Sequence, residues 1–188
     1  MELSLKEKEI LLSAAKESIK SLFGKADIPT VDYKVYPNLK LKAGAFVTLK
    51  IKNELRGCIG YITSEQPLFE TICEVAKHAA IQDPRFPPLT QKEFNSIDIE
   101  ISVLSPMKKI SDYSEIKIGE HGLLVEEGHN RGLLLPQVAT ENNFTVNQFL
   151  TSICMKAGLS SDLWQRKKLN LKVFTALIFH EERSKKDE

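Results

Sequence analysis

The segment from Ile97 to Leu104 restricts the fold of this chain more than any other. Isoleucine or valine occupies every second position from residue 97, and Asp98, Glu100 and Ser102 lie between them. Because successive side chains of a β-strand point to opposite faces of its sheet, this alternation predicts a strand. One face of that strand is expected in the core, and the other is expected to be polar.

Further β-type runs occur at residues 44–52, 55–62, 123–126, 133–137 and 171–179. The polar pair Asn53-Glu54 separates the first two runs, which predicts an antiparallel hairpin. The turn-rich segment 127–132 separates the next two and makes them a second hairpin candidate, in which Pro136 marks an edge position or a bulge. The last run is apolar on both faces and predicts a central strand.

Helices are predicted from capping signals and helical spacing of apolar residues. Ser4 with Glu7, and Thr145 with Gln148, form capping-box signatures, and Pro67 suits the first residue of a third helix. The predicted helices run over residues 4–23, 67–82 and 145–157. Helices and strands together predict an α/β chain of the α+β type.

Length and composition predict one domain. A chain of 188 residues with 42% hydrophobic residues can bury one core, or a core split into two lobes, with 181–188 as a charged tail. The 26 basic and 25 acidic residues nearly cancel. This balance disfavours nucleic acid and anionic membranes as partners, although a local basic patch would still allow nucleic acid to bind.

The chain is expected to be cytoplasmic. No apolar run approaches the roughly 18 residues that span a bilayer, and the N-terminus is charged instead of signal-like. Three cysteines, at positions 58, 73 and 154, fit a reducing compartment. Their spacing excludes zinc sites of the CxxC type, and no metal site is predicted.

Residues 55–60, Leu-Arg-Gly-Cys-Ile-Gly, form the main candidate for a functional site. On a strand, Arg56, Cys58 and Gly60 would share a face, and a guanidinium beside a thiol favours the thiolate. Such a cysteine could act as a nucleophile or redox group. Gly57 and Gly60 would let a ligand or another chain approach closely. The alternative is a small buried cysteine with a structural role, beside glycines that permit a bulge.

Two other side chains could assist Cys58 in catalysis. Glu100 could orient Arg56 or act as a base if the two strand faces adjoin, and the alternative is a solvated face paired with lysines. His121 lies between glycine-containing segments and could serve as an acid or base, or simply be exposed to solvent.

Residues 83–88, Asp-Pro-Arg-Phe-Pro-Pro, predict a rigid loop, because three prolines fix the backbone. Asp83 could cap a backbone group, and Arg85 could bind a carboxylate or phosphate. The alternative is an Asp83–Arg85 pair that only rigidifies the loop.

Several segments together strongly resemble the AMMECR domain family over roughly residues 10 to 180. Those segments are 44–49, the hexapeptide 55–60, 83–89, 99–106 and 134–139. Phe144, where tryptophan is expected, and Glu120, where a basic residue is expected, depart from the family pattern.

The resemblance implies a larger lobe with an antiparallel sheet, flanked by helices and containing both chain ends, and a smaller lobe, with a cleft between them. It also implies kinship with AmmeMemoRadiSam system protein A, and hence association with a Memo-type protein and a radical-SAM protein. Gln137, in one matched segment, joins Asp83, Arg85, Gly57 and Gly60 as a binding candidate.

Two functions are compatible with these observations. The first is a small-molecule-acting enzyme or enzyme subunit, in which Cys58 is the nucleophile or redox group. The alternative is a noncatalytic binding or regulatory module that docks a protein, a metabolite or nucleic acid. Neither the residues nor the resemblance names a cofactor.

Overall fold

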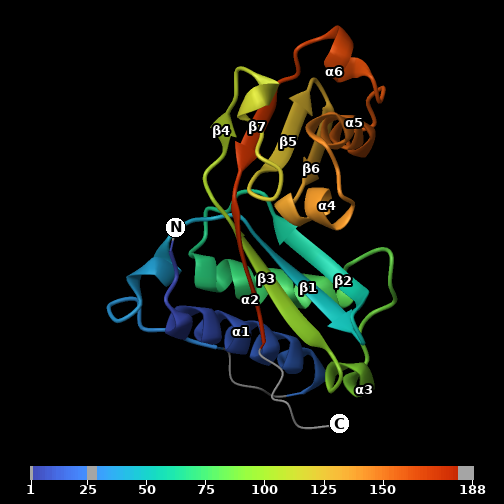
Figure 1. The fold of residues 1–188 in the computed structure, drawn as a ribbon. Helices are drawn as coiled ribbons and strands as arrows, with labels where there is room; N and C mark the ends of the chain where they lie inside the picture. Colours follow the sequence, from blue (N-terminus) through green and yellow to red (C-terminus); the bar gives the residue numbers. More distant parts are fainter. Residues whose placement is uncertain (1, 25–28, 182–188) are drawn as a thin grey trace. The chain divides into compact units, whose positions relative to one another are not determined.

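The computed structural model describes residues 2–24 and 29–181 (Figure 1). The predicted tail lies outside these residues apart from Glu181. The described residues fall into two compact units: residues up to 104 together with 177–181 form the first, and residues 105–176 form the second. The first unit therefore contains both ends of the described chain.

The first unit is built on a four-stranded sheet with the strand order β2-β1-β3-β8. The central strand β1 pairs antiparallel with both β2 and β3, and these three strands lie side by side in Figure 1. The elements of this unit are α1 (Leu5–Lys20), η1 (Ser21–Phe23), η2 (Pro37–Lys40), β1 (Ala45–Ile51), β2 (Glu54–Tyr61), α2 (Leu68–Ile81), α3 (Gln91–Phe94), β3 (Asp98–Leu104) and β8 (Ala176–His180), of which only the first residue is counted with the second unit.

One face of this sheet and the helices α1 and α2 enclose the larger core. Val47 and Leu49 of β1 and Ile99 and Ile101 of β3 are fully buried, as the alternation in β3 predicts. The opposite face of β3, which was predicted to be polar, is not exposed along its whole length, because Ser102 on that face is also buried.

The N-terminal capping box is confirmed and links α1 to the next segment. The Glu7 carboxylate accepts the Ser4 amide at 2.9 Å and the Asn38 side-chain amide at 3.3 Å. Glu7 is buried, so these bonds replace the water that the carboxylate loses on folding.

The predicted first hairpin is confirmed, with its turn one residue earlier than expected. Lys52 and Asn53 form the turn, and their φ angles of 52° and 67° are both left-handed, as in a type I′ turn. Glu54 therefore belongs to β2.

The second unit has its own four-stranded sheet, with the order β4-β7-β5-β6. Phe149, Leu150 and Ile153 of α5 are fully buried in a core with Leu123 and Val125 of β5. The elements of this unit are β4 (Lys108–Lys109), η3 (Tyr113–Glu115), β5 (Gly122–Glu127), β6 (Asn130–Leu134), α4 (Pro136–Glu141), α5 (Val146–Lys156), α6 (Leu163–Arg166) and β7 (Leu171–Phe174). The mixed α/β class with antiparallel sheets flanked by helices is confirmed.

Two predictions for this region are wrong. The expected central strand 171–179 is two strands, β7 in the second sheet and β8 in the first, separated by Thr175. Each half is apolar because it joins a different core. The second wrong prediction is the role of Pro136, which begins α4 instead of marking a strand edge or bulge, since proline suits the first turn of a helix. The second hairpin itself is confirmed, and it turns at Gly128-His129 within the predicted segment.

Within residues 2–24 and 29–181, no helix combines the length and apolar character needed to cross a membrane.

The β1–β2 turn generates a stability prediction. Replacing Lys52-Asn53 by Asn-Gly should raise the free energy of unfolding by about 1 kcal/mol, because lysine is strained at positive φ and Asn-Gly suits this turn. Chemical denaturation measures the change. Asn53→Gly alone serves as the control for the Lys52 contribution, and an unchanged or lower stability of the double variant would contradict the type I′ geometry.

Candidate functional site

The hexapeptide lies in β2 and contains a β-bulge. Leu49 pairs with Gly57 and Lys50 pairs with Leu55, so Arg56 is an extra residue with no partner in β1. The bulge interrupts the alternation that predicted Arg56 beside Cys58. The predicted contact between the Arg56 guanidinium and the thiol is not formed.

The Arg56 guanidinium is bound instead to Glu93 at the start of α3. Its Nε and Nη2 atoms donate to the two carboxylate oxygens of Glu93 at 2.8 and 3.1 Å, and Nη2 also donates to the Pro87 carbonyl at 3.0 Å. Arg56 together with Thr90 lowers the pKa of Glu93 to about 2. Arg56 therefore connects β2 to α3 through a two-point ion pair with Glu93, and to the proline loop through the Pro87 carbonyl.

Asp83 connects the same loop to the outer edge of β2. One carboxylate oxygen accepts the Cys58 amide at 2.8 Å and the Arg85 Nη2 at 2.7 Å, while the other accepts the Arg85 amide and Nε at 3.1 and 2.9 Å. The carboxylate is almost fully buried. Hydrogen bonds from the Arg85 guanidinium hold the pKa of Asp83 well below its usual range, against the effect of burial. The loop is thus fixed by an ionised Asp83–Arg85 pair.

The Phe86 ring contacts both arginines of the site. The guanidinium carbons of Arg56 and Arg85 lie 5.8 and 5.5 Å from its centroid, which is within cation–π range. Phe86 is half-buried, whereas the three prolines and Arg85 of the loop are exposed. We call residues 83–88 together with Arg56 the proline-loop surface.

The Cys58 thiol is half-buried and hydrogen-bonded. The Thr48 hydroxyl on β1 donates to its sulfur at 3.2 Å. Burial raises the pKa of the Cys58 thiol, and the Thr48 hydrogen bond and the Arg85 charge only partly offset this. The thiol is therefore protonated at neutral pH, which lowers its reactivity as a nucleophile.

Gly57 and Gly60 are required by the packing of the protein itself. A Cβ atom on Gly57 would lie 2.2 Å from the Ala79 carbonyl oxygen of α2, and one on Gly60 would lie 2.3 Å from the Ala45 carbonyl oxygen. The close approach that these glycines predicted is made by this chain's own backbone.

Glu100 lies on the same face of the sheet as Cys58. Thr48 pairs with Cys58 on one side and with Glu100 on the other, so the two side chains are two strands apart. Lys50 donates to the Glu100 carboxylate at 3.0 Å, which is the lysine-paired arrangement weighed as the alternative. Glu100 also lines a hollow of ≈ 360 Å³ with Lys50, Asn53, Asp98, Ile99, His180 and Glu181.

His121 and Gln137 belong to the second unit, whereas the other predicted site residues belong to the first. The His121 Nδ1 accepts the Lys117 amide at 3.2 Å, and only 15% of its side chain is exposed. The Gln137 side-chain carbonyl, in α4, is buried and has no hydrogen-bond partner among the described residues.

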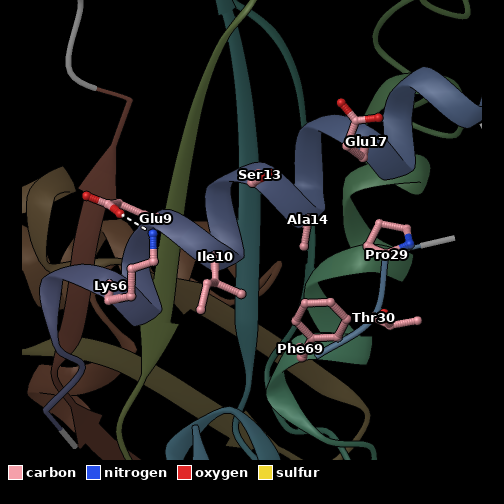
Figure 2. Close-up of a pocket in the computed structure, with 9 residues that line it drawn as sticks. All are labelled: Lys6, Glu9, Ile10, Ser13, Ala14, Glu17, Pro29, Thr30 and Phe69. Atoms are coloured by element: carbon pink, nitrogen blue, oxygen red, sulfur yellow. Dashed lines mark hydrogen bonds and ion pairs between the residues drawn. The ribbon is translucent and has the colours of Figure 1, made fainter. Parts of the chain in front are cut away.

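A separate hollow of ≈ 560 Å³ runs along α1 (Figure 2). An ion pair between Lys6 and Glu9 crosses one part of it, and Phe69 of α2 forms part of its wall. None of the predicted site residues lines this hollow. No group of three or more His, Cys, Asp and Glu side chains that could hold a metal ion occurs among the residues that the structure describes.

Glu93 and Thr48 also belong to the site, and neither was predicted from the sequence. Thr90 and Glu93 carry a capping-box spacing, which could have marked Glu93 as an ordered carboxylate near the proline loop. No sequence signal marks the bulge at Arg56 that directs its guanidinium there.

The buried Asp83 carboxylate generates a prediction of pH-dependent stability. Asp83→Asn should lower the free energy of unfolding at neutral pH by roughly 1–3 kcal/mol, because hydrogen bonds to a charged group are lost. The folded pKa is depressed, so this stabilisation is present above the unfolded pKa of about 3.9 and is lost as the pH falls through the folded value.

The difference between wild type and Asp83→Asn should therefore shrink below about pH 4 in denaturation series at several pH values. Asp32→Asn, which removes an exposed carboxylate of the same unit, is the control. A difference that does not change with pH would contradict the ionised Asp83–Arg85 pair.

Comparisons with known proteins place the chain in a family. A protein of Methanothermobacter thermautotrophicus is 47% identical over 147 residues, covering 75% of this chain and 77% of the relative. A protein of Sulfolobus acidocaldarius is 42% identical over 189 residues, covering 95% of this chain and 83% of the relative. The crystal structure of an uncharacterised protein from Pyrococcus horikoshii is similar, with a TM-score of 0.84 and 40% identity, covering 93% of this chain and 91% of that one.

The family model described as AMMECR1 matches residues 12–179, which include every predicted site residue. This chain therefore belongs to the AMMECR1 family.

Proposed function

We propose that this protein is a noncatalytic binding module that docks a partner protein through the proline-loop surface. The observation that carries this proposal is the Asp83 carboxylate, which binds the Cys58 amide and the Arg85 guanidinium at once. These hydrogen bonds anchor the loop to β2 while its prolines and Arg85 remain exposed.

A surface that is rigid before binding loses little conformational entropy when a partner docks. Arginine and aromatic side chains are enriched among the residues that dominate binding energy, and this surface presents Arg85 beside Phe86. Both arginines are paired with carboxylates, so the surface carries no net charge from these four groups. Its neutrality favours a protein over nucleic acid.

The proposed partners are those that the family resemblance implies, a Memo-type protein and a radical-SAM protein. In this proposal the chain contributes recognition, and the chemistry belongs to the partner.

The second candidate is a small-molecule-acting enzyme or enzyme subunit with Cys58 as nucleophile or redox group. It is supported by the position of Glu100 on the same sheet face as Cys58 and by the Arg85 charge near the thiol. His121 would be a further acid or base. The raised pKa of the Cys58 thiol favours the binding module over this candidate.

Alkylation of Cys58 by iodoacetamide as a function of pH separates the two candidates. The binding module predicts an apparent thiol pKa above about 8.5, because burial disfavours the thiolate. Mass spectrometry of the peptide that contains Cys58 measures the rate, and Cys58→Ser gives the baseline from Cys73 and Cys154. An apparent pKa below that of a free thiol would favour the enzyme and count against the binding module.

Substitution of Arg85 tests the docking surface. Arg85→Ala should weaken binding to a Memo-type protein from the same organism by at least about tenfold, or roughly 1.4 kcal/mol, because both the exposed cation and the fixed loop are lost. Calorimetry or surface plasmon resonance measures the affinity. Cys58→Ser should bind as wild type does.

Arg131→Ala is the matched control, since Arg131 is 52% exposed against 55% for Arg85 and is also paired with a carboxylate. Binding that survives both Arg85→Ala and Phe86→Ala would rule out docking at this surface. If Cys58→Ser alone abolished function, the second candidate would replace the first.

A further inference from the structure

The two edge strands of the first sheet, β2 and β8, differ in the contacts that other parts of the chain make with their backbone. At the β2 edge, the Asp83 carboxylate accepts the Cys58 amide and Arg56 forms a bulge that binds the Pro87 carbonyl. Carboxylates, bulges and covering loops are common ways of closing an edge strand. At the opposite edge, the strand order ends at β8, and no described strand lies beyond it.

The outward-facing backbone groups of β8 follow from two hydrogen bonds to β3 and its continuation. The Glu181 amide donates to the Ile99 carbonyl at 3.4 Å, and the Ser105 amide donates to the Thr175 carbonyl at 2.9 Å. In an antiparallel pair, the direction of the backbone groups alternates from residue to residue. Residues 175, 177, 179 and 181 therefore face β3, and Ala176, Ile178 and His180 direct their N–H and C=O groups away from the sheet.

Within residues 2–24 and 29–181, this outward edge lacks the proline, the charged side chains and the backbone-binding side chains that commonly protect an edge strand. The five residues of β8 include no proline, lysine, arginine, aspartate or glutamate. No side chain in the described part of the chain hydrogen-bonds to the backbone of Ala176, Ile178 or His180. Ile178, at the centre of the strand, is an exposed large apolar side chain.

We infer that β8 pairs antiparallel with β8 of a second copy of this chain, with Ile178 on the two-fold axis. The backbone N–H and C=O groups of Ile178 would then bond those of Ile178 in the second copy. Ala176 would pair in the same way with His180 of the second copy, and the reverse. The two four-stranded sheets would join into one continuous sheet across the axis.

The strand itself indicates a second copy as the occupant. An antiparallel pair of identical strands is self-complementary, because a two-fold axis gives each residue the partner that its copy has. The central pair is two β-branched apolar side chains, which is a favourable cross-strand pair, and no like charges face each other. A five-residue strand buries little area, so the dimer should be weak and depend on concentration.

Sedimentation velocity over a concentration series tests this inference. The apparent mass of the wild type should rise from the 21.2 kDa of one chain towards twice that value. Ile178→Lys should stay monomeric, because it places two like charges directly opposite each other. Ile118→Lys is the matched control, since Ile118 is 37% exposed against 38% for Ile178 and lies in the second unit.

Hydrogen exchange of the wild type gives a second measurement that does not depend on a variant. The amides of Ala176, Ile178 and His180 should exchange more slowly as the protein concentration rises, whereas the Cys58 amide at the closed edge should not change. A chain that stays monomeric at all concentrations, or a dimer that Ile178→Lys leaves intact, would overturn the inference. Both outcomes are independent of docking at the proline-loop surface.

Discussion

The buried Asp83 carboxylate joins parts of the first unit that are distant in sequence. It accepts the amide of Cys58 from β2 and the guanidinium of Arg85 from the proline loop, so it closes a sheet edge and fixes a loop with one group. A buried carboxylate is stable only when its lone pairs are occupied, and the four donors around Asp83 meet that requirement. The anchoring of the proline loop to β2 at Cys58 depends on this carboxylate.

The chemistry of the hexapeptide follows from this arrangement. The Arg56 side chain, at the bulge, binds Glu93. The Cys58 thiol accepts a hydrogen bond from Thr48, and burial raises its pKa. Gly57 is required by contact with α2. The hexapeptide has the composition of a reactive site, but its Arg56 side chain and Cys58 amide bind the proline loop. Because that loop is exposed, recognition is proposed in place of catalysis.

The two edges of the first sheet also differ in what lies against them. At the β2 edge, Asp83 of the loop that follows α2 binds the Cys58 amide, while the β8 edge is formed by a strand that the chain reaches only after leaving the second unit. The closed edge leaves side chains available for docking, and the open edge leaves backbone groups available for strand pairing. The two proposals therefore use different physical interactions on one sheet.

The sequence alone determined the elements whose signals are local. The capping boxes of Ser4 and Thr145 and the alternation of β3 depend on neighbouring residues, and each was predicted. Only the tertiary structure decided that residues 171–179 divide between two sheets and that the Arg56 guanidinium binds Glu93 instead of lying beside the Cys58 thiol. A continuous run of apolar residues has the same sequence pattern whether it is buried in one core or divided between two. A bulge is set by the register of two strands, which no single segment encodes.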